Sequence, residues 1–202
     1  RLVRKRGEVM QSAVPNGSGS MAATLGLDDT VIIEECNKAS QKGIVEAVNF
    51  NSPGQVVIAG EREAVAYACD LLKEAGAKRA LVLPVSVPSH CSLMKDAANE
   101  FKHSVDNIEW RTNDLKVIHN VDADYSKTVE EIKSKLVEQL YKPVLWTSSV
   151  LKMKESSVEK LIEVGPGKVL SGLTRRIDKS LSASAIIDVN SLKSTIEEIS
   201  NA

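Results

Sequence analysis

One segment organises the first half of the chain: Ile44-Val45-Glu46-Ala47-Val48-Asn49-Phe50-Asn51-Ser52-Pro53-Gly54-Gln55-Val56-Val57-Ile58-Ala59. Its two ends are rich in β-branched and apolar residues, which favour strands. Between them, residues 51–54 supply the asparagine, serine, proline and glycine that are typical of a turn. The segment therefore predicts a β-hairpin with strands over 44–50 and 55–59.

The hairpin is flanked on each side by a strand and a helix. Before it, an apolar strand over 20–26 precedes Asp28 and Asp29, whose carboxylates favour the start of a helix that runs to about residue 40. After it, an amphipathic helix over 61–75 is ended by Gly76, and a strand follows over 78–85. The order β-α-β-β-α-β predicts a ferredoxin-like subdomain over residues 17–86.

The rest of the chain alternates helices with strands, which predicts a parallel sheet with helices on its faces. Helices are expected over 1–11, 89–106, 128–140 and 168–177, from Pro143 and from about residue 191, and strands over 116–121, 159–164 and 183–189. Three strands are too few to bury such a sheet, and the chain opens inside a helix without a cap. We therefore expect an α/β fold in which 17–86 are inserted into an incomplete larger domain, 1–16 and 87–202.

The composition narrows the class of protein. Of the 202 residues, 43% are hydrophobic and 26% charged, with a formal net charge of -1, which gives no reason to expect a nucleic acid or an anionic membrane as partner. No apolar run has the length of a membrane span, and no signal peptide opens the chain. The three cysteines lack the spacing of metal ligands, and their odd number disfavours a disulfide framework, so we expect a cytoplasmic protein without a metal.

A histidine follows the fourth strand of the small subdomain, in the stretch from Pro84 to Lys95. The pattern predicts His90 at the start of a helix, where Pro88 stiffens the entry and Ser89 leaves space around the ring. Such a histidine suits general-base chemistry, although the same pattern fits one that only caps or packs. No Gly-x-Ser-x-Gly elbow occurs in the sequence to supply a nucleophile. Cys91 is a less favoured alternative nucleophile, because it is too close to His90 along the chain for an in-line pair.

Three other segments bear on a site. Residues 139–144 join two predicted helices, and a backbone carbonyl at the end of the first is free to accept the imidazole N–H and orient His90. Residues 49–55 place amides at the hairpin tip, where they either line a pocket or cap the turn. Residues 165–168, Gly-Pro-Gly-Lys, lack the glycine and Ser/Thr of a P-loop and predict a tight turn between strand and helix.

Taken together, these motifs resemble those of the malonyl-CoA:acyl carrier protein transacylases of fatty acid synthesis. The resemblance covers essentially the whole chain. It rests on Arg6-Gly7 with Met10-Gln11, Ala13-Val14-Pro15, residues 48–60, 76–80 and 84–94, Asn120-Val121-Asp122, Gln139-Leu140-Tyr141, Pro143-Val144, Trp146-Thr147 and residues 163–170.

The resemblance implies a large α/β hydrolase-like domain with a ferredoxin-like insertion, and a ping-pong mechanism. A serine in a Gly-His-Ser-Leu-Gly elbow takes malonyl from coenzyme A and passes it to the phosphopantetheine thiol of acyl carrier protein. It further implies that His90 is the base, that the main-chain carbonyl of Gln139 holds His90, and that Arg6 clamps the malonyl carboxylate. Met10, Asn51 and Gln55 are implied as further substrate-binding residues. No permanently bound cofactor is expected, since coenzyme A thioester is the substrate.

The sequence departs from the family in lacking the N-terminal Gly-Gln-Gly-Ser-Gln segment and the serine elbow. We therefore expect these 202 residues to be the C-terminal two-thirds of the enzyme and to be inactive alone. Two alternatives stay open: an acyltransferase of a polyketide pathway with another extender unit, and a non-catalytic binding fragment.

Paired cations predict where an acidic carrier protein docks. Lys78-Arg79 and Arg175-Arg176 are the two candidate pairs, and ordinary solvated surface is the alternative explanation for both.

Overall fold

The computed structural model describes residues 1–15, 17–85, 87–111 and 115–200. It contains two compact units, Arg1–Trp146 and Thr147–Ala202, which are described separately below. Both combine helices with sheets, which confirms the α/β class in its coarse sense. Asn16 and Ser86, on which the predicted domain boundaries fall, lie outside the described residues.

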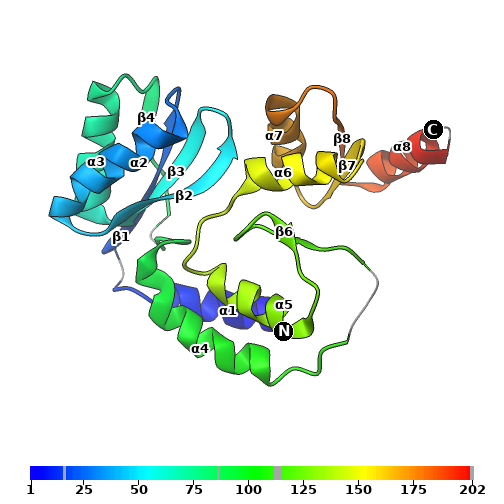
Figure 1. Ribbon diagram of the computed structural model, residues 1–202, viewed down its shortest axis with the longest axis horizontal. Helices are drawn as coiled ribbons and strands as arrows, with labels where there is room; N and C mark the ends of the chain where they lie inside the picture. Colours follow the sequence, from blue (N-terminus) through cyan, green and yellow to red (C-terminus); the bar gives the residue numbers. More distant parts are fainter. Residues whose placement is uncertain (16, 86, 112–114, 201–202) are drawn as a thin grey trace. The chain divides into compact units, whose positions relative to one another are not determined.

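The first unit contains a four-stranded sheet. Its strands are β1 (Gly19–Leu25), β2 (Val45–Ser52), β3 (Gln55–Glu61) and β4 (Arg79–Val82), in the order β2-β3-β1-β4 with every neighbouring pair antiparallel (Figure 1). The predicted hairpin is confirmed as β2 and β3, and its turn is tighter than expected because β2 continues to Ser52.

Two helices cover one face of this sheet, α2 (Asp29–Ala39) and α3 (Arg62–Glu74) (Figure 1). Val56 and Ile58 of β3 point to the helices and are fully buried with Ile32 and Leu72. The alternate residue Val57 points to the opposite face, where it packs with Cys91. The period of two along β3 therefore places one apolar row under the helices and another against the segment that follows β4.

A second core in the same unit holds the helices α1 (Leu2–Ser12), α4 (Lys95–Asp106) and α5 (Val129–Glu138). Val9, Met94, Phe101 and Leu140 are almost completely buried there. In this cluster, the segment before α4 packs against the segment after α5. His90 lies in the first segment and Gln139 in the second, so the packing brings these two residues together.

Two predicted elements of this unit are wrong in extent. The helix expected from residue 89 begins at Lys95, after a 3-10 turn over Ser92–Met94, because the preceding backbone turns at His90. The strand expected over 116–121 is reduced to β5 (Ile118–His119), which pairs antiparallel with β6 (Asp124–Tyr125) rather than joining a parallel sheet. A tight turn reverses the chain there, with Ala123 N–H donating to the His119 carbonyl at 2.9 Å.

The second unit alternates helices and strands as predicted. Its elements are α6 (Trp146–Glu155), β7 (Lys160–Val164), α7 (Val169–Ile177), β8 (Ser182–Ile186) and α8 (Val189–Ser200), and β7 pairs parallel with β8. The helix expected from Pro143 starts later, since Val144 and Leu145 use their N–H groups to bind the Val48 and Asn120 carbonyls. Among the described residues, no helix has the length and apolarity needed to cross a membrane.

Candidate functional site

His90 occupies a turn in the left-handed backbone region. Its φ of 68° is unusual for a residue with a side chain and costs of order 1–2 kcal/mol. The conformation is held from outside the turn, because His90 N–H donates to the Leu140 carbonyl at 2.9 Å. The backbone therefore aims the imidazole toward the end of α5.

The imidazole is oriented by a second carbonyl from the same segment. Its Nδ1 lies 2.7 Å from the Gln139 carbonyl oxygen, which can only accept a hydrogen bond. Nδ1 therefore carries the proton, and Nε2 is left with a lone pair. A histidine in this tautomer can take a proton through Nε2, as a general base does.

The surroundings of the ring favour its neutral form. Burial lowers the pKa of His90 below the ordinary value of 6.5, and the positive charge of Arg6 lowers it further, while the Gln139 carbonyl works in the opposite direction. A neutral imidazole at pH 7 is the form that a general base requires.

Arg6 lies on α1 with its guanidinium partly buried. Its Nε is buried and has no hydrogen-bond partner among the described residues. Burial also lowers the pKa of this guanidinium, although arginine stays charged at neutral pH. An incompletely paired cation beside a neutral histidine is suited to bind a carboxylate of a ligand.

Cys91, the alternative nucleophile, is packed rather than presented. Its side chain is fully buried, and its Sγ donates to the Pro88 carbonyl at 3.1 Å. Burial raises the pKa of this thiol to about 12, so the reactive thiolate is scarce at neutral pH. The other histidines do not join His90: His103 is exposed on α4, and His119 is buried in β5.

The sequence matches a known protein family. The family model described as "Acyl transferase domain" matches residues 1–196. The chain belongs to this acyl transferase family.

Similar proteins in the family carry the same functional name. The malonyl CoA-acyl carrier protein transacylases of Haemophilus influenzae and Escherichia coli K12 are 52% and 51% identical over 197 residues, which are 98% of this chain and 63% and 64% of theirs. Among solved structures, a malonyl-transacylase in complex with a type II polyketide synthase acyl-carrier protein has a TM-score of 0.96 at 51% identity, covering 98% of this chain and 64% of that one. An acyl carrier protein S-malonyltransferase from Vibrio cholerae has a TM-score of 0.94 at 54% identity, covering 96% and 63%. The chain thus spans a little under two-thirds of the length of these relatives.

The other predicted site residues of this chain are spread over the first unit. Asn51 lies near the end of β2 and Gln55 begins β3, and both are partly exposed. Met10 is 7% exposed and packs in the core of α1 and α4, so it has a structural role whether or not it touches substrate. The substrate-binding role of all three stays a prediction.

The predicted docking cations are exposed. In the first unit, Lys78 directly precedes β4 and Arg79 is its first residue. Arg175 and Arg176 lie on α7 in the second unit, where Arg175 Nη2 donates to the Ala183 carbonyl at 3.1 Å. Arg175 is therefore partly occupied within its own unit.

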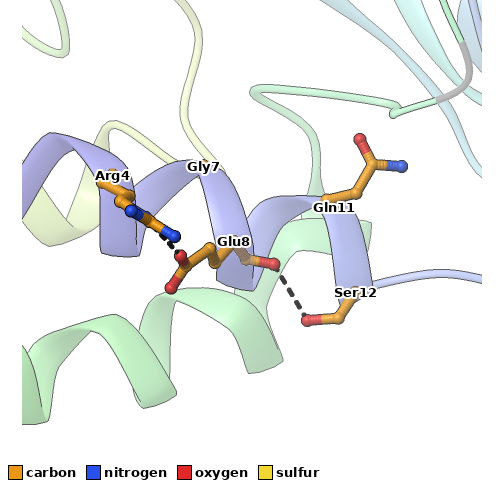
Figure 2. Close-up of a pocket in the computed structure, with 5 residues that line it drawn as sticks. All are labelled: Arg4, Gly7, Glu8, Gln11 and Ser12. Carbon is orange, nitrogen blue, oxygen red and sulfur yellow. Dashed lines mark hydrogen bonds and ion pairs between the residues drawn. The ribbon is translucent and has the colours of Figure 1, made fainter.

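α1 also carries a shallow hollow that is separate from the candidate site around His90. Figure 2 shows its lining, in which Arg4 pairs with Glu8 at 2.9 Å and Ser12 donates to the Glu8 carbonyl at 3.1 Å. The lining contains neither His90 nor Arg6, so the hollow is not the candidate site.

Sequence reasoning missed two groups that hold the histidine turn. The Leu140 carbonyl accepts from His90 N–H, and the Glu46 carboxylate accepts from Ser92. The one available signal was Glu46 itself, a charged residue inside an apolar strand, and nothing in the sequence connects it with Ser92.

Proposed function

We propose that the complete protein carrying these residues transfers the malonyl group of malonyl-CoA to the phosphopantetheine thiol of acyl carrier protein. The observation that carries the proposal is the 2.7 Å contact of His90 Nδ1 with the Gln139 carbonyl, which leaves Nε2 ready to accept a proton. The names of the relatives supply the substrates, since each is a malonyl transferase that acts on acyl carrier protein.

In the proposed reaction, His90 Nε2 removes the proton of a serine hydroxyl as the serine oxygen attacks the thioester carbonyl. The C–S bond breaks, and the imidazolium returns the proton to the departing coenzyme A sulfur. The carrier thiol then gives its proton to His90 and attacks the malonyl-serine ester, whose serine oxygen recovers that proton. The sequence contains no serine elbow, so we assign the serine to a part of the protein outside the 202 residues.

Arg6 supplies the selectivity in this proposal. Its guanidinium would bind the free carboxylate of malonyl, which satisfies the unpartnered Nε and discriminates against acyl groups without a carboxylate. The chemistry needs no permanently bound cofactor, because the thioester is already activated.

We further propose that residues 17–86 form a ferredoxin-like subdomain inserted between 1–16 and 87–202 of an α/β hydrolase-like domain. The strand order β2-β3-β1-β4 with two helices on one face supports the first part. The parallel pairing of β7 and β8 supports the second. Three buried free cysteines fit a reducing compartment, which favours the cytoplasm.

The test is intact mass spectrometry of the complete protein before and after malonyl-CoA, with His90→Ala, His103→Ala and Gln139→Ala as variants. We expect one malonyl group on the parent chain, and acylation at least about 100-fold slower in His90→Ala. His103→Ala is the matched control on the exposed face of α4, and Gln139→Ala should acylate normally because the main-chain carbonyl remains.

Acylation of His90→Ala at the parent rate would contradict the proposal. So would an adduct on residues 1–202 alone, which would bring Cys91 or a local serine forward as nucleophile. A panel of acyl-CoA donors separates the polyketide alternative, since a preference for a substituted malonyl group would favour it. The absence of any adduct on the complete protein would favour the non-catalytic alternative.

A further inference from the structure

A carboxylate outside the proposed mechanism contacts the turn that carries His90. Glu46 of β2 accepts hydrogen bonds from Ser92 N–H at 3.2 and 3.3 Å, one to each carboxylate oxygen, and a further one from the Ser92 hydroxyl. Ser92 lies two residues after His90 and opens the 3-10 turn before α4. Hydrogen bonds to a partly buried carboxylate are stronger than bonds between neutral groups, so this contact anchors the turn.

The same strand holds the segment on the other side of the imidazole. Asn49 forms a parallel bridge with Val144. Phe50 N–H donates to the Val144 carbonyl at 2.9 Å, and Val144 N–H donates to the Val48 carbonyl at 2.8 Å. β2 is thus attached to the turn that carries His90. It is also attached to the segment after α5, whose Gln139 carbonyl accepts the hydrogen bond from His90 Nδ1–H.

A histidine whose backbone is in the left-handed region needs such support from neighbouring segments. The Leu140 carbonyl holds His90 N–H on one side, and Cys91 is buried against Val48 of β2 on the other. A residue in this backbone region keeps its conformation only where its surroundings determine it. The Glu46 contact is the polar part of that support.

We propose that Glu46 is a positioning residue that keeps the imidazole of His90 on the Gln139 carbonyl. By fixing Ser92 to β2, it holds both partners of the His90–Gln139 hydrogen bond to one strand. The inference rests on the proposed function for its kinetic consequence only, since the orientation of the ring is observable without turnover.

The experiment measures the ring ¹⁵N chemical shifts of His90 and malonyl transfer kinetics in the complete protein. In Glu46→Ala we expect kcat to fall roughly tenfold with the KM for malonyl-CoA unchanged, and the single Nδ1–H tautomer to become a mixture. Glu46→Gln should recover most of kcat and the single tautomer, because its amide oxygen still accepts the Ser92 N–H. Glu34→Ala, an exposed glutamate on α2, is the matched control.

Parent kcat together with a single tautomer in Glu46→Ala would overturn the proposal. If Glu46→Ala does not fold, Glu46→Met decides, because its side chain is of similar length but lacks both carboxylate oxygens: a mixed tautomer and a lower kcat would support the proposal, and parent values of both would overturn it. If the parent protein does not transfer malonyl, the proposed function fails, while the tautomer measurement still tests the role of Glu46.

Discussion

At the scale of single residues, the site depends on one histidine acted on by three separate effects. The backbone of His90 is in the left-handed region, its Nδ1 is bound to a carbonyl, and its ring is partly buried beside a cation. The first effect aims the ring, the second selects the tautomer, and the third keeps the ring neutral. None of them uses an acidic side chain as the orienting partner, since a carbonyl performs that task.

The lowered pKa of His90 predicts a dependence on pH. We expect kcat/KM for malonyl-CoA to fall in acid with an apparent pKa below 6.5, because partial burial lowers the pKa of His90 and the base is lost only when the ring is protonated. The folded state binds fewer protons than the unfolded state here, and burial lowers the pKa of His119 as well. The contribution of both histidines to the free energy of unfolding is therefore fully present above pH 6.5. It is lost as the pH falls from 6.5 through their lower folded-state pKa values. A profile with an apparent pKa above 6.5 would contradict the assignment of His90 as base.

We expect replacement of Arg6 to reduce the selectivity for malonyl over acetyl groups. In Arg6→Ala, kcat/KM for malonyl-CoA should fall about 10- to 100-fold, because a charged hydrogen-bonding partner of the carboxylate is lost. Transfer of an acetyl group, which lacks the carboxylate, should not fall. Steady-state kinetics with both donors measure this, with Arg4→Ala on the exposed face of the same helix as control. Full activity of Arg6→Ala would place the carboxylate clamp elsewhere.

At the scale of elements, β2 connects the small sheet with the site. It pairs with β3 over most of its length, and its residues 48–50 bind Val144. The sheet is kept tight by close backbone approach at Gly60, where an added Cβ would lie 2.0 Å from the Ile44 carbonyl oxygen. At its far end from Gly60, α3 finishes in a Schellman motif, in which Gly76 N–H donates to the Lys73 carbonyl and Ala77 N–H donates to the Leu72 carbonyl.

Alanine substitutions at Gly60 and Gly76 should lower the free energy of unfolding by different amounts. Gly60→Ala should destabilise by about 3 kcal/mol or more, because its methyl group meets backbone that cannot move without breaking the β2–β3 pairing. Gly76→Ala should cost about 1–2 kcal/mol, since its φ of 100° is strained for alanine but the space is open. Urea denaturation of both variants measures the difference. Equal losses would show that backbone conformation, not close approach, limits β3.

At the scale of the whole molecule, charge bears on the partner. The formal net charge of these 202 residues is only -1, so any attraction they exert on the proposed acidic carrier protein has to come from local groups of cations. Lys78 and Arg79 are exposed at the start of the edge strand β4, whereas Arg175 donates a hydrogen bond within its own unit. We therefore expect the first pair to contribute more to docking than the second.

Charge reversal tests this expectation. Arg79→Glu should raise the KM for carrier protein more than the KM for malonyl-CoA, and the difference should shrink as salt is added. Lys102→Glu on α4, which removes an ion pair with Asp106, is the control. Equal effects of Arg79→Glu on both KM values would argue against docking at this pair.

Local patterns in the sequence were sufficient for much of the fold. The hairpin of β2 and β3, the helices α2 and α3 and the alternation in the second unit follow from apolar periodicity and turn residues, which act between near neighbours. The strand predicted over 116–121 was too long, because only Ile118 and His119 pair with β6. The chain turns directly after them, and Asp122 in that turn forms an ion pair with Lys135. The helix start at 89 was wrong for a similar reason, since the Leu140 carbonyl fixes the backbone of His90.

By itself, then, the sequence determined the order of the elements, the antiparallel hairpin and the candidacy of His90. The tertiary structure alone decided the left-handed turn, the Nδ1–H tautomer and the anchoring of Ser92 by Glu46. The physical reason is distance along the chain. His90 and Gln139 are 49 residues apart, and Glu46 and Ser92 are 46 apart, so no local preference links them. The packing of β2 against both segments, together with the core shared by α1, α4 and α5, brings these groups within hydrogen-bonding distance.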